Sequence, residues 1–236
     1  MITIRKSDAR GKGDRGWLKS HFTFSFADYN DPAFSGFRAL KVMNEDLIAP
    51  GKGFGPHAHR DMEIITFVLE GRLAHRDSMS GPHIVGPNEI QTMSAGTGVV
   101  HSEFNASETE PVHLMQIWIE PAAEDVPPSY QQVAIAAESK RGRLHLLAGP
   151  SSGDGTPATT INQDARLYVA ELARGESVTQ PLAPKRHAWV QVMRGAASLN
   201  GQALTEGDGA AVSDERELLV RGDGAQGGEV LLFDLP

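Results

Sequence analysis

Short segments of apolar or alternating residues recur along this chain, and turn residues separate them about every eight to twelve positions. This pattern is typical of a β-sandwich or barrel, and helical periodicity is scarce. We therefore expect an all-β chain, with a first group of strands at residues 37–42, 63–70, 72–77, 89–93, 101–105 and 113–119. A second group is expected at residues 144–147, 166–171, 188–193, 196–199, 217–221 and 230–233.

Two pairs of metal-binding side chains lie in segments that have the pattern of strands: His57 with His59, and His101 with Glu103. Residues i and i+2 of a strand point to the same face and lie about 6.6 to 6.8 Å apart along it. Two such pairs on facing strands can converge on one ion. Three imidazoles and one carboxylate leave open positions on a six-coordinate metal, as a catalytic or ligand-binding site requires.

Each pair taken alone has a less specific interpretation, because His-x-His is common on the polar face of an ordinary strand. The sequence around the two pairs favours a metal site. Gly51, Gly53 and Gly55 precede the first pair, and Gly96 and Gly98 precede the second. These segments resemble the two signature motifs of the cupin superfamily, in which a glycine-rich turn leads into a His-x-His strand and a Gly-x-x-His strand completes the site.

The two halves of the chain have a weak internal similarity. Each contains an apolar strand that ends in glycine and then a second strand, EIITFVLEGRLAH in the first half and HAWVQVMRGAASL in the second. When these glycines are aligned, Pro181 and Ala183 occupy the positions of the first histidine pair, so the second half lacks those ligands. A proline-rich break at residues 121–128 ends the first half. We expect an N-terminal domain at residues 1–128 with the metal site, and a C-terminal domain at residues 129–236 without metal ligands.

Composition narrows the classes of partner. A formal net charge of −8 argues against binding to a nucleic-acid backbone. The absence of cysteine excludes thiolate ligands and leaves nitrogen and oxygen ligands. The chain has neither a membrane-length apolar run nor the apolar region of a signal peptide, so we expect a cytoplasmic protein without a membrane partner. The segment 151–160 is expected to be a loop. A second, solvated loop is expected to carry the N-terminal basic residues Arg5, Lys6, Arg10, Lys12 and Arg15.

Longer sequence segments narrow the resemblance to one family. HFTFSFADYNDP, GFGPHAHRDMEIITFVLEG, QTMSAGTGVVHSEFN, HLMQIWIEP and EVLLFDLP are similar to the bacterial branch of the pirins, many of which are labelled quercetin 2,3-dioxygenases. The resemblance implies a bicupin fold, with two cupin-type β-barrel (jelly-roll) domains in tandem. It also implies one divalent ion per chain, with Fe(II) expected and Ni, Mn, Co, Zn or Cu as alternatives. The residues that match the family's ligands are His57, His59, His101 and Glu103.

Glu63 is a second candidate carboxylate, four residues after His59 and on the same face if the strand continues. In many cupins a glutamate at this position binds the metal. The pirin pattern favours Glu103 as the ligand and leaves Glu63 as a partner that orients an imidazole or as a proton acceptor. An ordinary exposed strand residue is the alternative for Glu63. Asn105 is expected to orient Glu103. Four single histidines are expected to be packed or exposed rather than functional: His75, His83, His113 and His145.

The leading functional hypothesis is a metal-dependent dioxygenase of the quercetin 2,3-dioxygenase type. A flavonol would bind the ion through its 3-hydroxyl oxygen, Glu103 or Glu63 would take the proton, and O₂ would open the heterocycle to give a depside and carbon monoxide. The rival is a non-enzymatic metal-binding protein that regulates a protein partner, as some pirins are associated with regulation. A cupin isomerase or an oxidase of a small organic acid is a third hypothesis, and it predicts a narrow polar pocket. The sequence has no nucleophile elbow, phosphate-binding loop or dinucleotide fingerprint.

Overall fold

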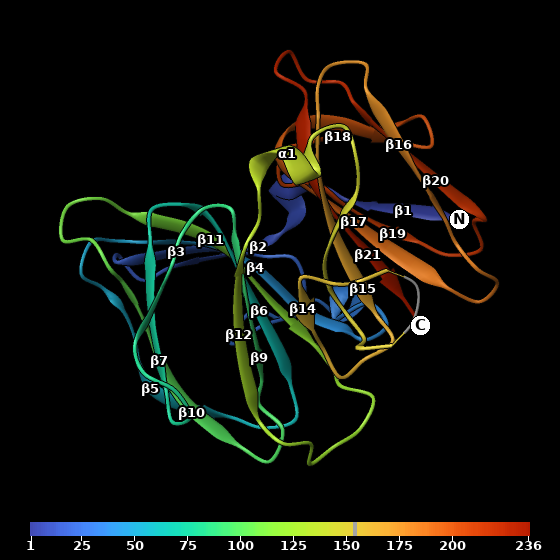
Figure 1. Ribbon diagram of the computed structural model, residues 1–236. Helices are drawn as coiled ribbons and strands as arrows, with labels where there is room; N and C mark the ends of the chain where they lie inside the picture. The colour runs from blue at the N-terminus through green and yellow to red at the C-terminus, as the bar shows by residue number, and fades with distance from the viewer. Residues whose placement is uncertain (153–154) are drawn as a thin grey trace. The chain divides into compact units, whose positions relative to one another are not determined.

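The computed structural model describes residues 1–152 and 155–236. The expected all-β architecture is confirmed: strands dominate, and helix within these residues is confined to one short α-helix and two 3-10 turns (Figure 1). Residues 153 and 154 of the expected loop lie outside the described residues. None of the described helices combines the length and apolarity needed to cross a membrane.

Contacts divide the chain into two compact units. The N-terminal unit comprises Gly11–Ile135 and Ala158–Gln163, and the C-terminal unit comprises Met1–Arg10, Ala136–Pro157 and Asp164–Pro236. The N-terminal unit contains β2 (Gly11–Asp14), β3 (Leu18–Phe22), η2 (Pro32–Phe34), β4 (Leu40–Ile48), β5 (Gly53–His59), β6 (Glu63–Glu70), β7 (Leu73–Asp77), β8 (His83–Val85), β9 (Glu89–Ser94), β10 (Val99–Asn105), β11 (Val112–Ile119), β12 (Ser129–Ala134) and β14 (Thr159–Thr160). The C-terminal unit contains β1 (Ile2–Arg5), η1 (Ser7–Ala9), α1 (Ala137–Lys140), β13 (His145–Gly149), β15 (Arg166–Leu172), β16 (Ser177–Pro181), β17 (His187–Leu199), β18 (Gln202–Thr205), β19 (Gly209–Val212), β20 (Glu217–Gly222) and β21 (Gly228–Leu235).

The N-terminal unit is a sandwich of two antiparallel sheets. One sheet has the order β12-β9-β6-β11-β4-β3-β2, and the other has the order β5-β10-β7-β8. Leu73 and Val85 of the smaller sheet pack with Ile48, Val68 and Leu114 of the larger one in a single apolar cluster. Every residue of β6 except Glu70 is buried, so both faces of this strand are covered, which explains its continuous apolar run. The sandwich provides two facing walls, and side chains can meet between them.

The C-terminal unit has its own sheet and core. Its strands pair in the order β1-β19-β17-β21-β15-β13, and β17 continues into pairing with β18 and β20. Buried residues of β15, β17, β20 and β21 form one cluster that includes Leu172, Val190, Val220 and Leu232. Figure 1 shows the blue strand β1 among the orange and red strands of this unit.

Pairing explains why the units depart from the predicted division at residues 128 and 129. Strand β12 belongs to the N-terminal unit because it pairs with β9 along its whole length. The first ten residues belong to the C-terminal unit because β1 pairs with β19. The prediction of a solvated loop for the basic N-terminal residues is therefore wrong, since β1 and β2 occupy much of that segment and Arg5 and Arg10 are buried.

Two other strand predictions need correction. Strand β4 begins at Leu40 rather than at residue 37, because Phe37 and Leu40 close a tight turn in which Arg38 has a positive φ of 56°. The strands expected at residues 188–193 and 196–199 form one strand, β17. Its register against β21 shifts between Val192 and Arg194, and Gly195, the glycine that had suggested a break, pairs with Gly228 just after this bulge.

Candidate metal centre

The two ligand pairs lie on β5 and β10, which are hydrogen-bonded neighbours in one sheet rather than facing strands. The register places His101 directly opposite His57. A register shift between His101 and Glu103 then places Glu103 opposite Phe54. The two strands are very close at this irregularity, since a Cβ on Gly53 would lie 2.2 Å from the backbone oxygen of Glu103. Glycine at position 53 therefore permits the approach that brings the two pairs together.

Three imidazoles converge at this point. His57, His59 and His101 each offer a ring nitrogen, and these nitrogens all lie within 4.8 Å of one another. The Nδ1–H of His57 donates to the carbonyl oxygen of Gly55 at 2.8 Å, which fixes the tautomer and leaves the Nε2 lone pair available. His101 is 2% exposed, and neither of its ring nitrogens has a hydrogen-bond partner among the described residues. A buried imidazole without a partner is costly, and an ion bound at one of the two nitrogens would satisfy that nitrogen.

Burial keeps the imidazoles of His59 and His101 in the form that can bind a metal. Burial, together with the neighbouring His57 and His59, lowers the pKa of His101 to about 4, although Glu103 opposes the shift. Burial and His57 also lower the pKa of His59. Both rings are therefore neutral at pH 7, and a neutral imidazole is the metal-binding form.

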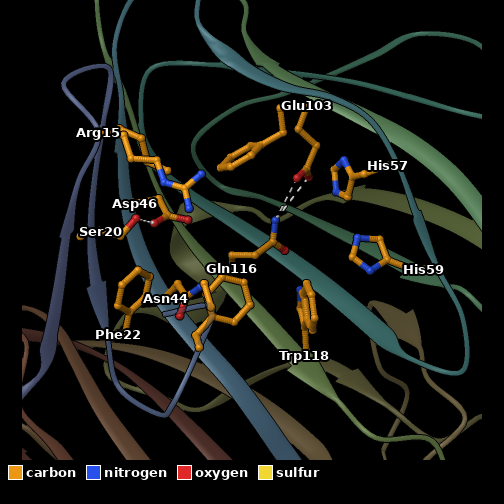
Figure 2. A pocket seen from close by; sticks show the side chains of 15 residues that line it. Arg15, Ser20, Phe22, Asn44, Asp46, His57, His59, Glu103, Gln116 and Trp118 are labelled. Atoms are coloured by element: carbon orange, nitrogen blue, oxygen red, sulfur yellow. Dashed lines mark hydrogen bonds between the residues drawn. The ribbon is translucent and has the colours of Figure 1, made fainter. Parts of the chain in front are cut away.

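Glu103 is buried beside this cluster and is oriented from the opposite sheet. The Nε2 of Gln116 on β11 donates to Oε2 of Glu103 at 3.1 Å and to Oε1 at 3.4 Å (Figure 2). Burial opposes ionisation of Glu103, but the neighbouring His75 and His101 and the hydrogen bond from Gln116 hold its pKa below the ordinary value. His75, His101 and Glu103 form a second group of potential ligands that shares His101 with the first.

His75 was expected to be merely packed or exposed, yet it lies against the candidate ligands. Strand β7 pairs with β10 so that His75 lies opposite Glu103, and its Nδ1 is 3.9 Å from Oε1 of Glu103. Its Nε2 lies 3.0 Å from Oδ2 of Asp77, and its Nδ1 lies 3.1 Å from Nε2 of Gln91. The signal available in the sequence is the i, i+2 spacing of His75 and Asp77, a third polar pair on a strand.

Glu63 does not share a strand with His59, so the parity argument for it is wrong. Strand β5 ends at His59, a turn follows, and β6 begins at Glu63 in the other sheet. Glu63 is fully buried, and its Oε1 accepts hydrogen bonds from Ser94 Oγ at 2.7 Å and from Asn162 Nδ2 at 3.1 Å. Burial raises its pKa against these hydrogen bonds. It is not part of the wall of the cavity described below.

The expectation that Asn105 orients Glu103 is also wrong. Asn105 Nδ2 donates to the carbonyl oxygens of Ile48 and Glu110, and its Oδ1 accepts from the backbone N–H of Ser107. The residue therefore fixes the loop after β10. Hydrogen bonds from Gln116 orient Glu103 instead.

A cavity of about 250 Å³ opens beside the cluster, between the two sheets. Figure 2 shows His57, His59 and Glu103 on one side and Arg15, Ser20 and Asp46 on the other. Aromatic and apolar side chains form much of the remaining wall: Leu18, Phe22, Phe26, Phe54 and Trp118. The ring of Trp118 meets His59 edge-on, with 4.9 Å between the ring centroids.

Asp46 gives the far side of the cavity a carboxylate. Its side chain accepts a hydrogen bond from Ser20 Oγ at 2.5 Å. Burial raises the pKa of Asp46 to about 6, although the Ser20 hydrogen bond opposes the shift. The wall thus combines aromatic surface with a few placed polar groups, which is the usual make-up of a small-molecule site.

Comparisons with known proteins agree with this architecture. Residues 3–119 match the family model named Pirin, and residues 146–235 match a model described as a quercetinase C-terminal cupin domain. The protein named quercetin 2,3-dioxygenase from Escherichia coli (strain K12) is 44% identical over 236 residues, covering 100% of this chain and 99% of that protein. A pirin-like protein from Caulobacter vibrioides is 38% identical over 93% of this chain and 94% of its own length.

A solved structure extends the similarity to three dimensions. The bacterial pirin YhhW of Escherichia coli, in complex with nickel(II), is 44% identical and has a TM-score of 0.92, with 100% of this chain and 99% of that chain covered. The bicupin fold inferred from the sequence is thereby confirmed. The chain belongs to the pirin family.

Proposed function

We propose that this protein is a metal-dependent dioxygenase that uses O₂ to open the heterocycle of a flavonol, giving a depside and carbon monoxide. One observation carries the proposal: the imidazoles of His57, His59 and His101 converge at the edge of a cavity with aromatic walls, and Glu103, which forms a second group with His101, lines the same cavity. The name of the Escherichia coli relative supports the same chemistry. A small-acid oxidase or isomerase would need a narrow polar pocket, whereas this cavity has aromatic walls.

We assign the binding of one divalent ion to His57, His59, His101 and Glu103. The unpartnered nitrogens of His101 and the fixed tautomer of His57 suit a metal site. Iron(II) is our choice, and nickel is the alternative supported by the nickel complex of the Escherichia coli pirin. When bound, such an ion supplies Lewis acidity and open coordination positions for substrate oxygen and O₂.

Glu103 is the residue proposed to accept the proton of the flavonol 3-hydroxyl group. It lines the cavity, and its lowered pKa keeps it ionised at neutral pH, as an acceptor must be. Gln116 holds its two oxygens from the opposite sheet. Glu63 is dropped from this role because it lies outside the cavity wall and its Oε1 is occupied by Ser94 and Asn162.

The apolar walls bind and shield the flat rings. Phe26 meets Trp118 edge-on at 5.5 Å, and Phe22 lies 5.7 Å from Phe26, so the three rings form one aromatic surface. Such a surface excludes water from the reacting centre and favours a planar ligand.

The test measures O₂ uptake and carbon monoxide release with quercetin, before and after removal of metal with a chelator. Turnover should require metal and should fall below detection in His57→Ala. His113→Ala is the matched control, because His113 pairs with Glu45 and is not part of the cavity wall. A protein that keeps one ion per chain but turns over no flavonol would overturn the dioxygenase and favour the regulatory alternative, in which a protein partner is bound instead.

A further inference from the structure

The side of the cavity away from the imidazoles carries acceptor groups that the proposed reaction does not use. Asn44 and Asp46 lie two residues apart on β4, and both line the cavity. Glu45 lies between them in the sequence and pairs with His113 instead. Strand alternation therefore presents one amide and one carboxylate to the ligand space.

Both groups are buried, and both can accept more hydrogen bonds. Asn44 is 3% exposed, and its Oδ1 has no hydrogen-bond partner among the described residues. Asp46 is 6% exposed, and the hydrogen bond from Ser20 uses one of its several acceptor positions. A buried acceptor without a donor is costly, so these two groups favour a ligand that brings donors to them.

The neighbouring walls restrict the shape of that ligand. Phe22, Phe26 and Trp118 surround the same space with aromatic surface, which suits a flat ring. In a flavonol, the donors fixed to the flat rings are phenolic hydroxyl groups. Arg15, which is exposed at the turn between β2 and β3, lies on the Asp46 side of the cavity (Figure 2).

We infer that Asn44 and Asp46 form a hydroxyl-recognition subsite. It selects flavonols that carry phenolic hydroxyl groups on an outer ring, away from the 3-hydroxyl and 4-carbonyl oxygens that face the metal. Asp46 is the specificity-determining residue, because a carboxylate accepts a stronger hydrogen bond than an amide does. The inference rests on the proposed function for the identity of the ligand. It goes beyond that function by naming what the far end of the ligand must carry.

The experiment measures binding without turnover. Nickel-loaded protein is titrated without O₂ using four probes: 3-hydroxyflavone, galangin, 3,3′,4′-trihydroxyflavone and quercetin. All four carry the 3-hydroxyl and 4-carbonyl oxygens, and they differ in which outer ring carries further hydroxyl groups. At least one hydroxylated probe should bind wild type about tenfold or more tightly than 3-hydroxyflavone, as expected for a hydrogen bond to a charged group.

Variants assign that preference to a residue. Asp46→Asn should reduce the preference to about threefold or less while leaving 3-hydroxyflavone binding unchanged, because one acceptor remains but the charge is lost. Glu45→Gln is the matched control: it removes a neighbouring carboxylate that pairs outside the cavity, and it should keep the full preference. Asp46→Ser replaces Asp46→Asn if circular dichroism shows that the latter is unfolded.

The outcomes separate this inference from the proposed function. Equal binding of all four probes to wild type overturns the subsite, and so does an unchanged preference in the Asp46 variant or a failure of every probe to bind. A preference that depends on Asp46, found in a protein that shows no turnover, supports the subsite and overturns the dioxygenase. Turnover of all four probes without any difference in binding supports the dioxygenase and overturns the subsite.

Discussion

At the residue scale, His101 is the side chain whose surroundings point most directly to a metal. It belongs to both groups of potential ligands, it is almost completely buried, and its two ring nitrogens lack partners within the described chain. Histidines that only fill a core normally hydrogen-bond through at least one nitrogen. His75 illustrates this, since Asp77 and Gln91 contact its two nitrogens.

Replacing His101 with alanine should therefore weaken metal binding by more than about tenfold, because the shared ligand is lost. The measurement is metal content by mass spectrometry after dialysis at a fixed concentration of free metal. His83→Ala is the control, because His83 bonds to Ser80 and stacks on Tyr130. Equal metal content in His101→Ala and wild type would contradict the assignment.

Gln116 should affect metal binding because it orients Glu103, in addition to lining the cavity. Gln116→Leu removes the donor to both oxygens of a buried carboxylate. We expect metal affinity to fall about 10- to 100-fold, as for other groups that orient a ligand. The free energy of unfolding should fall by about 1–3 kcal/mol. Metal titration and urea unfolding measure the two effects. Gln131→Leu, at a half-buried amide that bonds to Thr160 and is not part of the cavity wall, should leave metal affinity unchanged.

At the element scale, the register between β5 and β10 determines whether the ligands meet. The irregularity between His101 and Glu103 changes which residues of β5 lie opposite them. Strand β7, on the other side of β10, then brings His75 opposite Glu103. A regular ladder with the His57–His101 pairing would have placed Glu103 elsewhere, so the bulge is part of the site.

Gly53→Ala should disturb this register. Its Cβ would lie 2.2 Å from the backbone oxygen of Glu103 and 2.5 Å from the Cα of Phe104, so backbone atoms must move. We expect a loss of about 1–3 kcal/mol in the free energy of unfolding, as for other overpacked positions, together with weaker metal binding. Gly55→Ala is the matched control on the same strand, because its Cβ would meet nothing within 4 Å. Equal effects of the two substitutions would refute the role of the close approach.

At the scale of the whole molecule, the sequence predicted what depends on local pattern and missed what depends on pairing. The strand predicted at residues 63–70 coincides with β6, because its apolar run is a local pattern. His57 and His59 share a strand, β5, as their i, i+2 spacing predicted. Partners of a strand are set by contacts distant in sequence. For that reason the role of Gln116 could not be read from the residues around it, and His75 had only its i, i+2 spacing with Asp77 as a signal. Glu63 was placed on the same strand as His59 because the turn between them was missed.

The pairing of the first residues with β19 also predicts a pH dependence of stability. Asp208 accepts hydrogen bonds from Lys6 Nζ and the backbone N–H of Ser7, both at 2.8 Å. Burial opposes its ionisation, but Lys6 and the N–H groups of Thr205 and Ser7 hold its pKa below the ordinary value of 3.8. Because the pKa is lower in the folded state, the carboxylate stabilises the fold above about pH 4, and this contribution is lost as the pH falls through the folded-state pKa.

Asp208→Asn should cost about 1–3 kcal/mol in the free energy of unfolding at pH 7, and less below pH 4. Urea unfolding across this range measures the effect, with Asp8→Asn, at an exposed position, as the control. A loss that did not change with pH would show that shape, not charge, holds the N-terminal strand.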